Sequence, residues 1–289
     1  MTLQNANFKE GNIKTNAKNS SFDYLAMQFR LWKRMGMAVG FLPFSTVGYS
    51  LSNTSELTKD EDGTVINKTA SYAGDGGLQQ VFAGVGFKVL DNLSIGANIS
   101  YIYGDITHSV TTAFSNSSSF SSVRLDKISI NDYKLDFGLQ YSYKFNKKHV
   151  LNFGAVYSLG HSVNGKGYKY NQKWLNGADY PSTQTGDTIT NAFSLPHTFG
   201  AGLTYVYDNR LTIGADFTYQ QWEDAKFYNE KSYFSNRTKI AAGAEFVPNP
   251  YSRNYLKRVR YRVGGYYSDP YTKVDGQDGT REYGVSAGF

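Results

Sequence analysis

The chain has 289 residues, with 16% aromatic side chains, 29 glycines, only 6 prolines and no cysteine. The absence of cysteine excludes a disulfide framework and a thiolate metal site. The net charge of +6 comes from residues spread too thinly to predict a nucleic-acid partner, and no stretch approaches the roughly 20 apolar residues of a membrane-spanning helix.

The dominant pattern along the chain is an alternation of apolar and polar residues with a period of two, which indicates β-strands. With 24 tyrosines and 19 phenylalanines, it predicts an all-β fold. We expect about twelve strands and no helix. In chain order, the expected strands are residues 2–9, 20–32, 36–52, 67–90, 93–113, 122–146, 149–171, 187–208, 211–224, 235–247, 255–270 and 280–289.

The connections between these strands alternate in length. Three are tight turns rich in Asn, Asp and Lys, at residues 90–92, 146–148 and 208–210. Four are long polar loops, at residues 53–66, 114–121, 172–187 and 225–234. Outer-membrane barrels have short periplasmic turns and long extracellular loops. Several expected strands exceed the roughly ten residues that cross a bilayer at a tilt, so we expect them to project beyond the membrane.

The segment 211–219 shows how the two faces of a strand differ. Its odd positions are apolar and end in aromatic residues, whereas Gly214 and Asp216 lie on the small, polar face. A polar face of Gly, Ser and Asn suits a barrel lumen, and Tyr at strand ends suits an interfacial aromatic girdle. The pattern therefore predicts a transmembrane antiparallel up-and-down β-barrel with its apolar face toward lipid. A soluble all-β fold is the alternative.

Three segments carry a more specific pattern. Residues 194–227 combine a Leu-Pro pair that opens a strand, a Gly-rich strand, a tight turn and a strand ending in Trp. Residues 238–272 form an expected hairpin, and residues 36–50 contain a Pro-Phe pair. In their order, these segments resemble the FadL-type family of outer-membrane transporters for long-chain fatty acids and other hydrophobic compounds. The matching residues are Leu195, Pro196, Asp216, Trp222, Gly243, Glu245, Pro248, Asn249, Arg262, Gly264, Pro43 and Phe44, whereas Ser45 stands where the family usually has glycine.

The resemblance implies an outer-membrane channel for passive uptake of fatty acids or aromatic hydrocarbons, by passage through the lumen and lateral exit. It implies a bilayer with lipopolysaccharide, a small hydrophobic ligand and the barrel-assembly machinery as partners, and no cofactor. A general porin and a structural or adhesive barrel are the rival functions.

The resemblance also implies fourteen strands and an N-terminal hatch. Because about twelve strands, no hatch sequence and no signal peptide are visible, we interpret residues 1–289 as a single barrel domain that is incomplete at both ends. The alternative is a complete twelve-stranded barrel that ends at Phe289.

The first candidate site is Pro43 with Phe44, inside an expected strand. Proline removes a donor from the hydrogen-bond ladder and is confined to edges, bulges or kinks. The resemblance implies a kink that opens the wall sideways. A proline at the end of a strand is the simpler alternative.

The second candidate is a set of charged residues on the lumen faces of successive strands, namely Asp136, Asp216, Glu245, Arg260 and Arg262. Paired with one another, they would brace the interior. The alternative is an arginine that binds the carboxylate of a substrate. We expect Asp216 to brace Arg260 or Arg262.

The third candidate is Trp222, which with Phe227 and Tyr228 would shape an extracellular entrance groove. A girdle tryptophan is the alternative. No metal site is expected, because His108, His149, His161 and His197 are scattered and the acidic turns at 59–64 and 274–280 lack the full calcium spacing. No nucleophile motif such as GxSxG occurs, so we expect no enzyme.

Overall fold

The computed structural model describes residues 2–10, 13–21, 23–59, 61–116, 118–175, 181–190, 193–227, 231, 233–274 and 276–289. Nearly all of its regular structure is β-strand. No helix in these residues is long and apolar enough to cross a membrane. The strands are β1 (Thr2–Glu10), β2 (Ile13–Ser21), β3 (Leu25–Trp32), β4 (Met35–Lys59), β5 (Val65–Leu90), β6 (Leu93–Phe114), β7 (Phe120–Lys144), β8 (His149–Ser158), β9 (His161–Val163), β10 (Gly165–Leu175), β11 (Pro181–Thr190), β12 (Phe193–Leu195), β13 (Thr198–Tyr207), β14 (Leu211–Gln220), β15 (Arg237–Phe246), β16 (Tyr261–Ser268), β17 (Lys273–Val274), β18 (Gln277–Asp278) and β19 (Glu282–Gly288), with one helix, α1 (Tyr255–Arg258).

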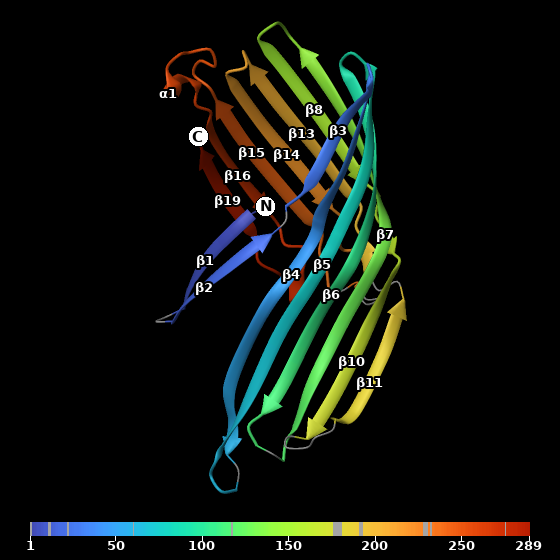
Figure 1. Ribbon diagram of the computed structural model, residues 1–289, viewed down its shortest axis with the longest axis vertical. Helices are drawn as coiled ribbons and strands as arrows, with labels where there is room; N and C mark the ends of the chain where they lie inside the picture. The colour runs from blue at the N-terminus through green and yellow to red at the C-terminus, as the bar shows by residue number, and fades with distance from the viewer. Residues whose placement is uncertain are drawn as a thin grey trace.

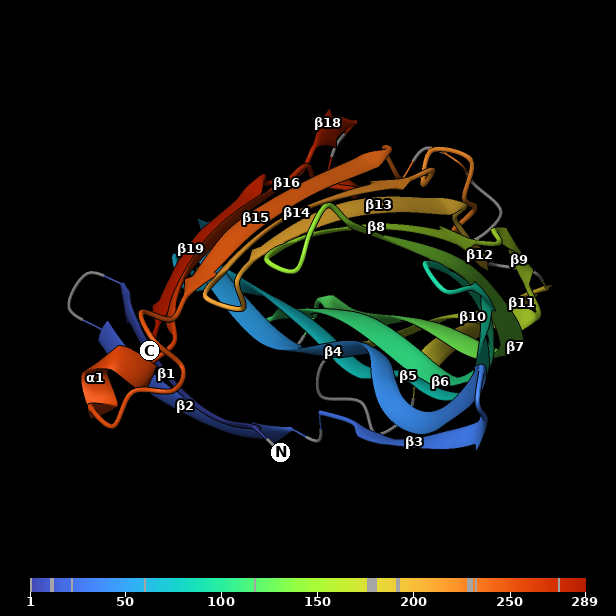
Figure 2. The same ribbon diagram turned by 90° about the horizontal axis from the view of Figure 1, so that it is seen from above.

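One curved antiparallel sheet forms the wall of the molecule (Figure 1). Its strands follow the order β19-β16-β15-β14-β13-β8-β7-β6-β5-β4-β3, so neighbours in sequence are mostly neighbours in space. The sheet curls around a central space, and the β1–β2 hairpin lies at the side between β19 and β3 (Figure 2). This arrangement confirms the predicted all-β, antiparallel, up-and-down fold. Within the described residues, β3 and β19 each pair on one side only.

Four neighbouring strands, β4 to β7, are about twice as long as the others. One half of each strand belongs to the wall, and the other half continues past it as an extension that also includes β10 and β11 (Figure 1). β8 pairs with the wall part of β7 from Asp136 to Lys144, whereas β10 pairs with its outer part from Phe120 to Ile130. The long strands thus project beyond the wall as part of a sheet of six strands, β4 to β7 with β10 and β11.

Several expected boundaries are wrong. Residues 172–187, expected as a loop, contain the end of β10 and the start of β11. The expected strand 20–32 is divided between β2 and β3, and β4 runs through the first half of the expected loop 53–66. Residues 255–258 form α1 instead of a strand, because the Asn254 side chain accepts a hydrogen bond from the Leu256 N–H and starts a helical turn.

The two faces of the wall differ as the alternation predicts. Large apolar residues such as Ile99, Ile213 and Phe217 are about half exposed on the convex face, at 58%, 47% and 45%. The concave face carries a row of directly paired glycines across β4 to β7, at Gly36, Gly86, Gly96 and Gly138. Such a face leaves space inside the wall, while the apolar face is suited to lipid.

Candidate functional site

The wall bends along a line that crosses β4, β5 and β6, where the extension begins. On β4, Phe44 is an extra residue, since Pro43 pairs with Gln79 and Ser45 pairs with the next residue, Leu78. This is a β-bulge, and bulges bend a strand. Proline at this place lacks the N–H that the ladder would otherwise require.

Glycines allow the neighbouring strands to follow the bend. Gly76 and Gly104 have φ angles of 106° and 143°, which side-chain-bearing residues rarely adopt. A Cβ at Gly76 would lie 2.2 Å from the carbonyl oxygen of Asp105, and one at Gly104 would lie 2.3 Å from that of Gly77. The bend therefore needs glycine both for its backbone angles and for the close approach of the strands.

An apolar cluster fills the concave side of this bend. Phe44 packs against it, so the bulge turns this side chain inward. The buried members are Leu78, Ile102, Ile128, Ile130, Val163 and Leu195, from β5, β6, β7, β9 and β12. The Pro43–Phe44 pair thus lies at a real kink of the wall and next to its apolar core.

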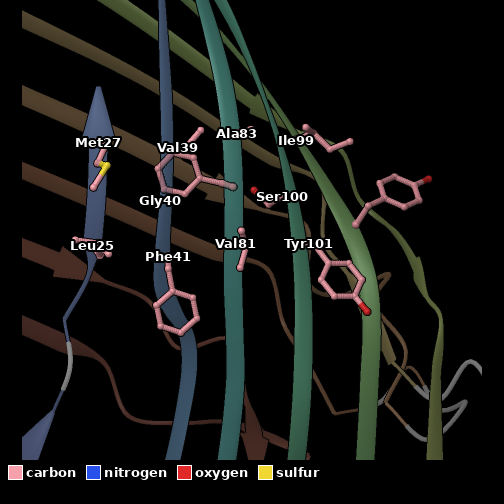
Figure 3. A pocket seen from close by; sticks show the side chains of 12 residues that line it. Leu25, Met27, Val39, Gly40, Phe41, Val81, Ala83, Ile99, Ser100 and Tyr101 are labelled. Carbon is pink, nitrogen blue, oxygen red and sulfur yellow. The ribbon is translucent and has the colours of Figure 1, made fainter. Parts of the chain in front are cut away.

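An apolar groove of about 600 Å³ lies on the convex side of the wall, between the kink and the tight-turn end (Figure 3). It extends from Leu25 and Met27 on β3 across Phe41 and Val81 to Tyr101. Ser100 also lines the groove; it is 2% exposed, and its hydroxyl accepts a hydrogen bond from the Gln80 amide at 2.7 Å. The groove therefore offers an apolar surface to whatever lies outside the wall.

The wall has a second irregularity where β8 leaves β7. Between the β8 and β10 pairings, the carboxylate of Asp132 accepts the N–H groups of Asn164 at 2.6 Å and of Tyr133 at 2.7 Å. His161 lies with Nε2 at 3.5 Å from this carboxylate, and its ring stacks on Tyr133 at 4.7 Å. The interrupted ladder offers these two backbone N–H groups no carbonyl oxygen, and the Asp132 carboxylate accepts their hydrogen bonds instead.

Glu245 accepts hydrogen bonds from Arg260 Nη1 and Arg262 Nε, both at 2.6 Å. The structure thus brings these three candidates together at the tight-turn end of the lumen. The expected contact of Asp216 with either arginine does not form. Asp216 pairs in register with Gly202 and Ala241, and it is exposed to the lumen.

Asp136 lies elsewhere on the lumen wall. Its carboxylate contacts the Lys134 ammonium and the Ser158 hydroxyl. These side chains brace β7 against the end of β8. The five charged candidates therefore form two separate groups and one isolated carboxylate, Asp216.

Trp222 lies among other aromatic side chains in the loops at the far end of the wall. Its ring is 4.9 Å from Tyr271 and 5.3 Å from Phe234, and its Nε1 donates a hydrogen bond to Gln220. Phe227 contacts the same cluster through Phe234, at 5.9 Å. Tyr228 lies outside the described residues. Trp222 is thus half-buried in a cluster that connects these loops.

Sequence reasoning missed that every histidine has a tyrosine neighbour. No group of three or more metal-ligating side chains occurs in the part of the chain that the structure describes. The pairs are His108 with Tyr49, His149 with Tyr205 and His197 with Tyr157, by hydrogen bonds, and His161 with Tyr133, by stacking. Only the cross-strand register brings them together, so no sequence motif indicates them.

Comparison with known families decides the membership of the chain. The family model described as BamG matches residues 1–289. The chain belongs to the BamG family. No curated protein matches this BamG-family chain.

Solved structures support the fold of this family member. A FadL homologue from Pseudomonas aeruginosa has a TM-score of 0.57 at 15% identity, over 96% of this chain and 66% of that one. The toluene transporter TbuX from Ralstonia pickettii has a TM-score of 0.54 at 14% identity, over 92% of this chain and 72% of that one. The Pseudomonas putida toluene transporter TodX has a TM-score of 0.52 at 14% identity, over 88% and 68%. The predicted FadL-type resemblance is thereby confirmed for the fold, and the chain spans about two thirds of the length of these relatives.

Proposed function

We propose that this chain is an outer-membrane β-barrel protein that works together with the barrel-assembly machinery. The observation that carries the proposal is the match of the BamG family over residues 1–289, because that family's name points to this machinery. The apolar convex face, with Ile99, Ile213 and Phe217 about half exposed, fits a protein that lies in the bilayer.

The edges of the sheet fit a partner role as well. β19 carries Val285 at 93% exposure and Tyr283 at 82%, on a strand whose outer side has no partner in the described ranges. An unpaired strand edge is a template for pairing with another chain.

The proposal is tested by a photo-crosslinking amino acid placed at Val285, in cells that express the full chain. A crosslink to a barrel-assembly protein is expected from Val285, on the unpaired edge strand. The matched control is Val263, which lies on the same face of the neighbouring strand β16 and pairs with Ala287. Equal yields from both positions, or no crosslink to that machinery from Val285, contradict the proposal.

A second candidate function is supported by the bend of the wall. An apolar cluster inside the kink and an apolar groove outside it lie on either side of Pro43 and Phe44. Such a pair of surfaces fits a channel that passes fatty acids or aromatic hydrocarbons from the lumen sideways into the membrane. The fold shared with solved hydrocarbon transporters favours this candidate.

Uptake of a radiolabelled fatty acid and of toluene by cells with and without the protein tests this second candidate. Filling the groove with Ala83→Trp, on its floor, is expected to slow uptake several-fold while the protein remains folded in the membrane. The control is Ala97→Trp on β6, which lies on the same face of the wall as Ala83 but outside this groove. Unchanged uptake in the deletion strain rejects the channel.

A further inference from the structure

The connection from β15 to β16, residues 247–260, differs from the other turns at its end of the wall. The turns at 33–34, 91–92, 145–148 and 208–210 are short, whereas this one contains α1 and stands out from the wall (Figure 1). Its start is anchored: Val247 is 4% exposed and its N–H donates to the carbonyl of Arg210 at 2.7 Å. The segment is therefore held beside the tight turns.

Hydrogen bonds order this turn from within. The side chain of Asn249 accepts the Tyr251 N–H at 3.0 Å, and that of Asn254 accepts the Leu256 N–H at 3.0 Å. The backbone N–H of Asn249 donates to the carbonyl of Lys257 at 2.8 Å, which closes the turn. Its side chains therefore point outward from a defined backbone.

Three large apolar side chains are exposed on this ordered turn. Tyr251 is 90% exposed, Tyr255 is 70% exposed and Leu256 is 64% exposed. Exposing such side chains to water is unfavourable, by roughly 25 cal/mol for each Å² of apolar surface. At the end of a wall with an apolar outer face, they fit the boundary between headgroups and acyl chains.

The same turn is strongly basic. Arg253, Lys257 and Arg258 are exposed and form no ion pair within the described residues. Arg260 is bound to Glu245, which it shares with Arg262. The turn itself contains no acidic residue.

The whole tight-turn end of the wall is positively charged. Its turns carry nine cationic residues and two acidic ones. These are Lys33, Arg34, Lys147, Lys148, Arg210, Arg253, Lys257, Arg258 and Arg260, against Asp91 and Asp208. The described connections at the opposite end are mixed in charge, with Glu61, Asp62, Glu223, Asp224, Asp269 and Asp278 beside Lys226, Lys231, Lys273 and Arg281.

We propose that the 247–260 turn binds anionic phospholipid headgroups in the membrane leaflet at the tight-turn end. Tyr251, Tyr255 and Leu256 insert at the level of the glycerol backbone, and Arg253, Lys257 and Arg258 contact the phosphates. Charge complementarity selects this occupant, because an anionic leaflet attracts each nearby basic residue by about 1 kcal/mol, or roughly five-fold in affinity. The inference rests on the proposed placement in the outer membrane. It requires neither a role in barrel assembly nor transport.

The test measures phospholipid binding by the full chain in detergent, with native mass spectrometry. Phosphatidylglycerol, phosphatidylcholine and lipopolysaccharide are the probes. The wild-type chain is expected to prefer phosphatidylglycerol, and the variant R253Q/K257Q/R258Q is expected to bind it at least ten-fold more weakly, by the roughly five-fold per charge given above. The control K59Q/K166Q/K231Q removes the same charge from positions away from the tight-turn end and is expected to bind like the wild type.

A second variant separates insertion from attraction between charges. Y251S/L256Q keeps every charge and is expected to lower the affinity for phosphatidylglycerol several-fold. Equal binding of the two lipids, an equal loss in both charge variants, or binding of lipopolysaccharide alone overturns the proposal. Retained lipid binding in a chain that neither crosslinks to the assembly machinery nor supports uptake rejects the functional proposals and leaves this one standing.

Discussion

The ring of Phe82 on β5 lies against Gly40 on β4, so closely that a Cβ at Gly40 would be 2.5 Å from Phe82 Cε1 and 2.8 Å from the carbonyl oxygen of Leu25. The two residues are directly opposite each other in the ladder, on the lumen face of the wall. Because Gly40 has no side chain, the Phe82 ring occupies the space that a side chain at Gly40 would fill. This contact lies directly behind the convex groove (Figure 3).

Gly40→Ala is expected to lower the free energy of unfolding by about 1–3 kcal/mol, because the added methyl group must displace both the ring and a backbone carbonyl. The shift in the temperature at which the detergent-solubilised barrel loses its compact band on gel electrophoresis measures this effect. Gly48→Ala, on the same strand, is the matched control, because a Cβ there has no neighbour within 4 Å. Equal losses in the two variants would show that the Phe82 contact is unimportant.

Gly76→Ala is expected to disrupt the bend of the wall. The φ angle of 106° and the 2.2 Å approach to the carbonyl oxygen of Asp105 act together, and the expected loss exceeds about 2 kcal/mol. Gly63 has a φ angle of 80° but open space around it, so Gly63→Ala isolates the backbone strain of about 1 kcal/mol. Thermal unfolding of both variants provides the comparison, and a loss at Gly76 no larger than at Gly63 rejects the steric argument.

Glu245→Gln is expected to destabilise the protein more than Arg262→Gln does. The first change removes the negative charge and one of the two acceptor oxygens that the two arginines share, whereas the second leaves Glu245 bound to Arg260. We expect about 1–2 kcal/mol for Glu245→Gln and less than about 1 kcal/mol for Arg262→Gln. Unfolding of the wild type and the two single variants in denaturant measures both values, and the reverse order contradicts the shared contact.

Asp105 gives the extension a contribution to stability that depends on pH. This residue lies on β6 beyond the bend, and a hydrogen bond from Ser129, followed by that from Lys127, lowers the pKa of its carboxyl below 3.8. A carboxyl group whose pKa is lowered by folding stabilises the folded protein at pH values above its ordinary pKa. That stabilisation is lost as the pH falls through the lowered pKa. Because both Asp105 and Lys127 are partly exposed, we expect no more than about 1 kcal/mol at neutral pH.

Comparing the wild type with Asp105→Asn measures this contribution. The difference in unfolding temperature is expected at neutral pH and should vanish at a pH well below 3.8, where both chains carry a neutral side chain. A difference in unfolding temperature that grows as the pH falls would contradict the predicted direction of the pKa shift.

The sequence predicts the wall well because one physical constraint repeats along it. In segments such as 93–103 and 211–219, one face is apolar and points outward and the other faces the lumen, so alternation is strict and the register follows. The extension has no such constraint. Because the first seven residues of β11, Pro181 to Asp187, carry few apolar side chains and no alternation, they are predicted as a loop.

The candidate site is predictable only in part. The lumen face of Asp216, Glu245 and Arg262 follows from alternation, but their partners depend on the stagger between strands. Glu245 is opposite Thr212, four residues from Asp216, which corresponds to roughly 13 Å along a strand. The bend escapes prediction for a similar reason, since Gly76 and Gly104 resemble the many other glycines until the backbone angles are known.

The central claim, a role beside the barrel-assembly machinery, is tested most directly by depleting the protein from its native cells. The measurement is the amount of folded outer-membrane barrels, by quantitative mass spectrometry of the outer membrane, against lipoproteins of the same membrane as an internal standard. We predict that unrelated barrels fall several-fold after depletion, before growth stops, while the lipoproteins stay constant. Unchanged barrels, with loss of hydrophobic-compound uptake alone, would contradict the claim and favour the channel.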